Sequence, residues 1–168
     1  MGVRLPHYGQ AWPALRDAAL RAEHLGFAHL WVNDHLWTPG RLHATPAFDA
    51  LTTLAALAPL TRTARLGTAV LSAAYRPPAL AAKQAAVLDV ISGGRLILGV
   101  GTGSDRAEHE AYGIPFGTRG ERTAGVERLV AAVRAMGERP EAAEVPGLLR
   151  HAPFLPPPAQ RPHPPLWL

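Results

Sequence analysis

The adjacent residues Asp34 and His35 offer the most specific chemistry in the sequence. They follow an apolar run, residues 27–32, that has the composition of a buried strand. A carboxylate beside an imidazole can fix the tautomer of the ring and raise its basicity, which suits proton transfer to or from a bound ligand. The same pair also occurs in ordinary turns, where the aspartate caps the backbone and the histidine lies on the surface. Asp34 and His35 are therefore candidate catalytic residues, provided that other segments bring a ligand site to them.

Three further strand-like runs also end in groups that could line such a site. The third run leads through Thr68 to Ser72, the fourth leads into the glycine-rich turn 101–104, and the first is followed by His7 and Tyr8. Trp37 lies just past the Asp34-His35 pair. Hydroxyl groups, aromatic rings and a glycine-rich turn together suit a polar, planar ligand. His7 and Trp37 are the candidate substrate contacts in this set.

Several common motifs are not supported. Gly99, Gly101 and Gly103 resemble a phosphate-binding turn, but the dinucleotide fingerprint Gly-x-Gly-x-x-Gly has its third glycine one position later, opening directly into a helix, and position 104 is serine. A nicotinamide-binding Rossmann site is therefore not favoured. The chain has no cysteine and no Walker loop, its histidines lack zinc spacing, and no nucleophile elbow surrounds Ser72 or Ser104. Neither a metal site nor serine hydrolysis is expected.

The elements that must position these groups alternate between strand and helix. Apolar periodicity predicts strands over residues 3–5, 27–32, 65–71 and 95–100, and a further strand beginning at 166. Helices are predicted around 15–25, 48–58, 78–91 and 126–133, the second of them starting with Thr45 as N-cap and Pro46 as the first helical residue. Residues 138–165 contain nine prolines and are predicted to be irregular.

This alternation implies a parallel sheet with helical crossovers. A doubly wound sheet fits within 168 residues, whereas a complete (β/α) barrel needs about 250, and periodicity alone does not separate the two. In both architectures the loops after the strands share one face and form the functional site. We therefore expect the groups that follow the strands to line one common site at the same edge of the sheet.

Composition limits the class of protein further. A chain of 168 residues with 48 % hydrophobic and 18 % charged residues indicates one globular domain. No apolar run is long enough for a membrane span, the first residues lack a secretory signal, and the absence of cysteine gives no sign of an oxidising compartment, so a cytoplasmic protein is expected. The 17 basic residues are spread along the chain, so neither nucleic acid nor a membrane is an expected partner.

Several blocks of the sequence resemble the bacterial-luciferase-like flavin oxidoreductases. They follow the order of that family over nearly the whole chain and are residues 22–27, 30–35, 65–71, 75–78, 82–84, 88–103, 112–113, 116, 119–122 and 162–168. The resemblance implies an α/β fold of the parallel (β/α) TIM-barrel type. It is incomplete here, with about four βα units and the start of a fifth strand in a single domain over residues 1–168.

The resemblance also implies a cofactor and a reaction. The cofactor is either FMN or the deazaflavin coenzyme F-420, and the reaction acts on a small organic substrate. The blocks 66–70 and 101–103 look more like the deazaflavin branch, which transfers hydride, while FMN-dependent monooxygenation is the alternative. Carried over by motif, His35 is the proton-transfer group with Asp34 beside it. The residues matched to cofactor contacts are Thr68, Ala69 and Val70 behind the ring, and Thr102, Gly103 and Ser104 at the phosphate-bearing tail.

Two departures from the family pattern bear on function. Many deazaflavin members have glutamate directly after Gly-Thr-Gly, whereas this chain has Ser104, so Asp105 and Glu108 are candidate replacements for that acid. The family also continues beyond a fifth strand. Four strands cannot close a barrel, so we expect open sheet edges, an exposed apolar inner face, and association with another copy or a completing half-barrel. A catalytically silent half-barrel that acts in assembly is the alternative function.

Overall fold

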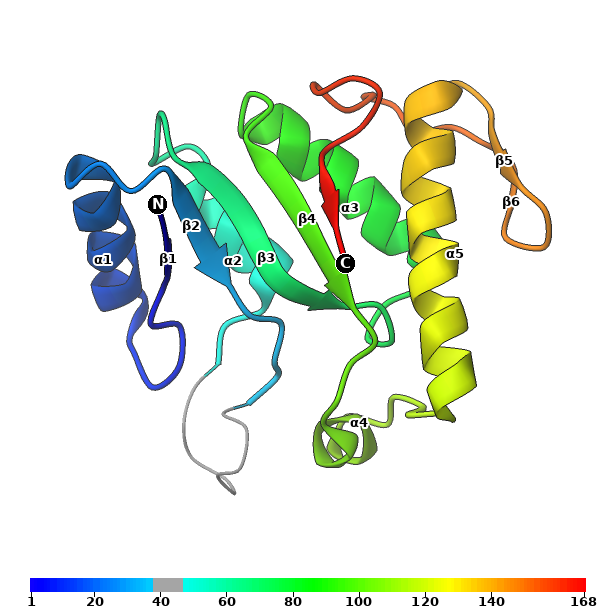
Figure 1. Ribbon diagram of the computed structural model, residues 1–168, viewed down its shortest axis with the longest axis horizontal. Coiled ribbons are helices and arrows are strands. Elements are labelled where there is room, and N and C mark those ends of the chain that lie inside the picture. The colour runs from blue at the N-terminus through cyan, green and yellow to red at the C-terminus, as the bar shows by residue number, and fades with distance from the viewer. Residues whose placement is uncertain (38–46) are drawn as a thin grey trace.

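The computed structural model describes residues 1–37 and 47–168. Five parallel strands form one sheet in the order β1-β2-β3-β4-β7 (Figure 1). Their bounds are Gly2–Arg4 for β1, His29–Val32 for β2, Arg65–Ser72 for β3, Leu96–Gly101 for β4 and Leu166–Trp167 for β7. The predicted parallel α/β arrangement, including the fifth strand, is confirmed. The strands observed are within about two residues of those predicted.

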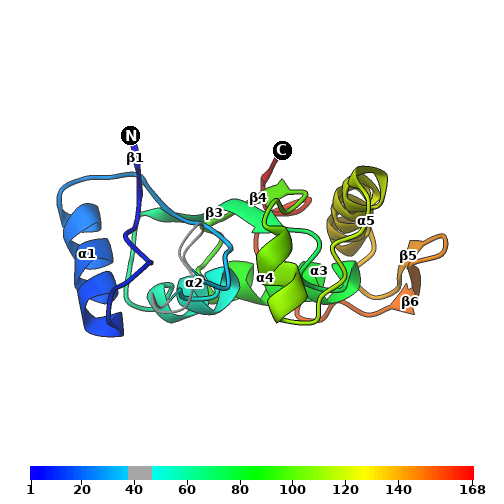
Figure 2. The ribbon, with the colours of Figure 1, turned by 90° about the horizontal axis from the view of Figure 1, so that it is seen from below.

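Helices join consecutive strands and pack on one face of the sheet. The crossover helices are α1 (Trp12–His24), α2 (Ala50–Leu57) and α3 (Pro78–Ile91), while α5 (Arg119–Glu138) precedes the return to β7. Figure 2 shows α2 and α3 lying on the same side of the sheet. Helix α5 begins with a capping box, in which the Glu121 amide donates to Thr118 Oγ1 and the Thr118 amide donates to the Glu121 carboxylate.

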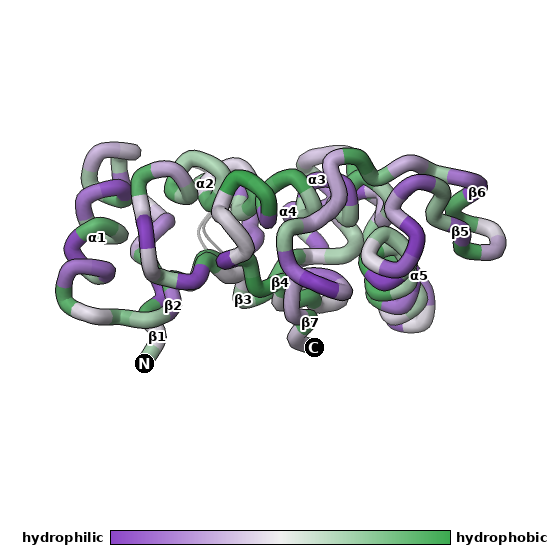
Figure 3. Tube along the Cα trace, turned by 90° about the horizontal axis from the view of Figure 1, so that it is seen from above, coloured by the Kyte–Doolittle hydropathy of each residue, from purple (hydrophilic) through white to green (hydrophobic). Residues whose placement is uncertain are grey.

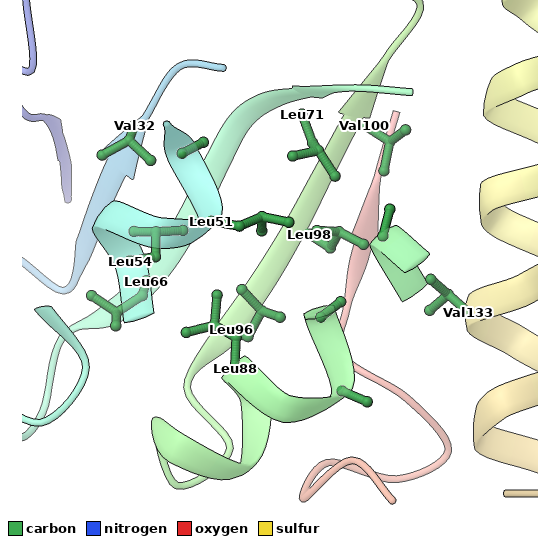
Figure 4. Close-up of a cluster of buried hydrophobic side chains, with 14 of the residues drawn as sticks. Val32, Leu51, Leu54, Leu66, Leu71, Leu88, Leu96, Leu98, Val100 and Val133 are labelled. Atoms are coloured by element: carbon green, nitrogen blue, oxygen red, sulfur yellow. The ribbon is translucent and has the colours of Figure 1, made fainter. Parts of the chain in front are cut away.

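The hydrophobic core lies between the sheet and these helices. Alternate strand residues point to the helix side, because successive side chains of a strand face opposite ways. Leu30, Leu66 and Leu98 are fully buried in this core. Figure 4 shows Leu66 and Leu98 of the sheet with Leu54 of α2 in the same cluster. Hydrophobic residues are concentrated in β3 and β4 and are mixed with hydrophilic ones along α1 and α5 (Figure 3). Shortening a buried leucine in such a core to alanine costs about 2–5 kcal/mol.

The opposite face of the sheet is open to solvent in the described structure. Trp31 of β2 and Trp167 of β7 lie across it with ring centroids 4.9 Å apart. Trp31 rests on Gly67, where a Cβ atom would meet the indole at 2.1 Å. Val70 and Trp167 are 46 % and 53 % exposed, and β1 and β7 each pair with a single strand. The expected open edges and exposed apolar inner face are therefore present.

Two sequence predictions about the elements need correction, and one falls partly outside the described residues. The proline-rich segment 138–165 contains an antiparallel hairpin, β5 (Ala143–Val145) and β6 (Leu149–Ala152). It forms because both strands are free of proline and Pro146 falls in the turn between them. Helix α4 (Arg106–Ala111), which has only six residues, was not predicted. The expected helix start at Thr45 and Pro46 lies outside the described residues, and α2 begins at Ala50 with Asp49 as N-cap.

Within residues 1–37 and 47–168, no helix combines the length and apolar character needed to cross a bilayer.

Candidate active site

An open cleft of about 350 Å³ lies where strands β2, β3 and β4 end. Its walls come from four segments that are distant in the sequence, namely 33–35, 69–72, Tyr75 and 101–104. The strands are parallel, so their carboxyl ends reach the same edge of the sheet. The sequence prediction that residues following these strands line one common site is therefore confirmed. The described residues contain no cluster of three metal-ligating side chains.

The Asp34 carboxylate joins the two sides of the cleft wall, and within the described part of the chain it forms no hydrogen bond with His35. Its Oδ2 accepts from the Ser72 amide at 2.9 Å and from Arg76 Nη1 at 2.6 Å, and its Oδ1 accepts from Arg76 Nη2 at 3.0 Å. Arg76 also bonds Asp49, the N-cap of α2. The expectation that Asp34 orients His35 is wrong, because the aspartate is 3 % exposed and engaged by β3 and Arg76.

The carboxylate that does contact His35 belongs to Glu108 of α4. His35 Nδ1 lies 2.9 Å from Glu108 Oε2, and the two residues are 73 positions apart in the sequence. Glu108 is fully buried, and its other oxygen accepts from the amides of Leu36 and Trp37 at 2.9 and 3.1 Å. Tyr75 donates its hydroxyl to Glu108 Oε2. Burial and this bond to a carboxylate raise the pKa of Tyr75, so its phenol stays protonated at neutral pH.

The floor of the cleft is made by irregular backbone in β3. The register between β3 and β4 shifts between Thr68 and Leu71, and the shift leaves Ala69 and Val70 facing the cleft. Gly101 lies opposite, where a Cβ atom would meet Val70 Cγ2 at 2.5 Å. Thr68 is not part of the cleft lining, because its hydroxyl is buried and donates to the Gly99 carbonyl at 2.7 Å. Ala69 and Val70 thus present an exposed apolar surface to a ligand.

The turn after β4 forms the far wall. Thr102, Gly103 and Ser104 line the cleft, as the sequence predicts. Gly103 adopts a φ of 75°, and a Cβ atom there would lie 2.6 Å from Ser72 Oγ and 3.4 Å from His109 Nε2. Both of these polar atoms are buried and have no hydrogen-bond partner among the described residues. The glycine therefore keeps the space beside Ser72 open.

The two predicted substrate contacts are placed differently from the expectation. His7 is fully buried, its Nδ1 lies 3.3 Å from the Leu5 carbonyl, and its ring packs on Tyr8 at 4.0 Å. Burial lowers the pKa of His7. Trp37 packs against Tyr112 with ring centroids 6.3 Å apart. Neither His7 nor Trp37 lines the cleft. The structure therefore does not support contact between either side chain and a substrate bound there.

Three residues of the site were not identified as such from the sequence. Tyr75 and Arg76 lie in a block that carried the family resemblance, and this was the available signal for them. For Glu108 the sequence suggests only a role as a replacement acid, which it shares with Asp105. Asp105 caps α4, accepting from the amides of Ala107 and Glu108 at 2.9 and 3.3 Å, which accounts for its position without a catalytic role.

Comparison with known proteins connects this geometry to a family. A family model described as luciferase-like monooxygenase matches residues 2–168. An F420-dependent glucose-6-phosphate dehydrogenase of Amycolatopsis mediterranei is 34 % identical over 123 residues, which are 73 % of this chain and 37 % of that protein. The chain thus spans little more than a third of the length of that relative.

Solved structures show the same fold. A structure of an F420-dependent secondary alcohol dehydrogenase with an F420-acetone adduct superposes with a TM-score of 0.85 and 22 % identity, covering 98 % of this chain and 50 % of that one. The oxygenating constituent of 3,6-diketocamphane monooxygenase from Pseudomonas putida, in complex with FMN, superposes with a TM-score of 0.69 and 18 % identity, covering 99 % and 50 %. These likenesses support the TIM-barrel type of fold, of which this chain contains about half.

Proposed function

The chain belongs to the luciferase-like monooxygenase family, and from this premise we propose that its cleft binds the ring of a flavin-type cofactor in an oxidoreductase. The proposed reaction is hydride transfer between the deazaflavin coenzyme F-420 and a small organic substrate, with FMN-dependent monooxygenation as the alternative. The observation that carries the proposal is the convergence of His35, the Ala69-Val70 surface and the turn 101–104 on one cleft. The F420-dependent glucose-6-phosphate dehydrogenase relative supports the deazaflavin choice.

The cleft suits a planar ring with a polar tail. Ala69 and Val70 offer an exposed apolar surface, and the Val70 side chain packs against Gly101, where a Cβ atom would meet Val70 Cγ2 at 2.5 Å. Beside them, the backbone and hydroxyl groups of Thr102 and Ser104 are exposed for polar contacts. We assign the ring to the Ala69-Val70 surface and the tail to the turn 102–104.

The protein residues would bind, orient and handle protons. When bound, the cofactor would supply the hydride-transfer or oxygen chemistry. His35 lines the cleft with 21 % of its side chain exposed, so it can exchange a proton with a substrate beside the ring. Asp34 and Arg76 keep the ends of β2 and β3 together, which fixes the distance between His35 and the ring surface.

Parallel titrations with FMN and coenzyme F-420, followed by ring fluorescence, test the proposal. Val70→Asp places a carboxylate on the ring surface, and we expect the affinity to fall at least roughly 10-fold, because a buried unpaired charge is costly. Leu80→Asp is the matched control, since Leu80 is 49 % exposed on α3 and lies outside the cleft. Stronger binding of F-420 than of FMN would favour hydride transfer. If neither cofactor binds, or if Val70→Asp binds as the native chain does, the proposed site is wrong.

A role in assembly without catalysis is the second candidate function. The exposed inner face around Trp31, Val70 and Trp167 favours it, because apolar surface of this kind marks interaction sites. In this case the purified protein would carry no flavin or deazaflavin absorbance and would bind neither cofactor in the same titrations. Binding that depends on Val70 and His35 would exclude a purely structural role.

A further inference from the structure

We propose that Glu108 is a positioning residue that holds His35 in the tautomer with a proton on Nδ1 and an unprotonated Nε2. As a statement about catalysis this rests on the proposed function, whereas the tautomer itself can be measured without any cofactor. Glu108 lies behind His35 and is fully buried outside the cleft lining, so its carboxylate does not reach a ligand in the cleft. Glu108 therefore acts through His35 and does not take the place of the glutamate that many deazaflavin members carry directly after Gly-Thr-Gly.

The hydrogen bonds around Glu108 fix which atoms carry protons. Oε1 accepts from two backbone amides, those of Leu36 and Trp37, and these groups can only donate. Oε2 lies beside the Tyr75 hydroxyl and 2.9 Å from His35 Nδ1. An ionised carboxylate has no proton to donate, so it accepts in all four of these bonds. His35 Nδ1 is therefore the donor.

A proton on Nδ1 determines the state of the other ring nitrogen. In a neutral imidazole one nitrogen carries the proton and the other is an acceptor, and the partner of one nitrogen sets the role of the other. Among residues 1–37 and 47–168, Nε2 of His35 has no hydrogen-bond partner, and the ring lines the cleft. Glu108 thus leaves Nε2 as a proton acceptor available to a ligand in the cleft.

The same bonds make Glu108→Gln an informative variant. The glutamine carbonyl can keep both backbone amides of Leu36 and Trp37, because these amides need an acceptor. The glutamine NH₂ group then replaces Oε2 and turns a donor toward His35 Nδ1. Nδ1 of His35 then has to accept this hydrogen bond, so the ring proton moves to Nε2. One isosteric change therefore inverts the tautomer while it retains the backbone contacts.

The experiment is a long-range ¹H–¹⁵N correlation spectrum of the imidazole groups at a pH where the ring of His35 is neutral. The signals of His35 among the eight histidines are assigned by their loss in His35→Gln. We expect the Nδ1–H tautomer to be favoured at least roughly 10-fold in the native chain, since a hydrogen bond to a charged group is stronger than a neutral one. We expect the Nε2–H tautomer in Glu108→Gln.

Glu110→Gln is the matched control, because Glu110 lies on the same helix with its side chain 66 % exposed and should leave the tautomer of His35 unchanged. An Nε2–H tautomer in the native chain, or an unchanged tautomer in folded Glu108→Gln, overturns the proposal. If Glu108→Gln does not fold, the native spectrum decides, together with Tyr75→Phe, which keeps the Glu108 acceptor and should preserve the Nδ1–H tautomer. Failure of cofactor binding in the separate titrations would remove the proposed function and leave this result standing.

Discussion

The guanidinium of Arg76 forms a two-pronged ion pair with the carboxylate of Asp34, with Nη1 2.6 Å from Oδ2 and Nη2 3.0 Å from Oδ1. The pair joins the end of β2 to the loop after β3, and the Asp34 side chain within it is fully buried. Removing one partner of a buried ion pair leaves the other charge uncompensated. The cleft wall therefore depends on this contact.

We expect Asp34→Asn to lower the free energy of unfolding by about 3 kcal/mol or more, measured by urea denaturation. The asparagine keeps the shape of the side chain but presents an amide group to Arg76. Asp17→Asn is the control, because the Arg16–Asp17 pair is 41 % and 63 % exposed and should contribute less than about 1 kcal/mol. A loss in Asp34→Asn no larger than that of the control would show that Asp49 alone suffices for Arg76.

We expect Gly103→Ala to destabilise the chain more than Gly26→Ala does. Both glycines have positive φ, 75° and 84°, so alanine at either position costs roughly 1–2 kcal/mol of backbone strain. Only at Gly103 would the new Cβ atom also meet Ser72 Oγ, at 2.6 Å, whereas nothing lies within 4 Å of it at Gly26. Urea denaturation of both variants isolates the cost of the contact. Adding Ser72→Ala to Gly103→Ala should recover that extra loss, and equal losses in both glycine variants would contradict this account.

The placement of the strand ends could be predicted from the sequence, whereas their side-chain partners could not. Parallel strands put residues 33–35 and 101–104 on one edge whatever the loops do. The partner of His35 is set by a six-residue helix, α4, which is too short to give a clear periodic pattern. Asp34, adjacent to His35, was therefore the apparent partner, although Arg76 engages it from 42 positions away.

We expect the stability of the native chain to fall as the pH drops below about 6.5, in part because of His7. Burial lowers the pKa of His7 in the folded state, so the unfolded chain binds its proton at a higher pH than the folded chain does. Stability therefore rises with pH across this window, by at most about 1.4 kcal/mol per pH unit for one proton. His7→Phe fills the site without titrating, so its stability should depend less steeply on pH between about 5 and 7. His24→Gln, on the last turn of α1, is the control. If the free energy of unfolding has the same slope against pH in His7→Phe and in the native chain, His7 does not cause this pH dependence.

We expect the purified chain to self-associate at micromolar concentrations through the exposed inner face of the sheet. Trp167 is 53 % exposed beside Trp31, and the edges β1 and β7 present unpaired backbone groups that can pair with another chain. Trp167→Lys should shift the distribution toward monomer, because it removes apolar area and places a charge on the face to which Arg4 already contributes one. Leu25→Lys is the control, since Leu25 is 67 % exposed just after α1 and away from this face. Analytical ultracentrifugation over a concentration series measures the distribution of monomer and oligomer. A monodisperse native monomer at roughly 100 μM would contradict the prediction, because it would mean that exposing Trp31, Val70 and Trp167 to water costs too little to drive association.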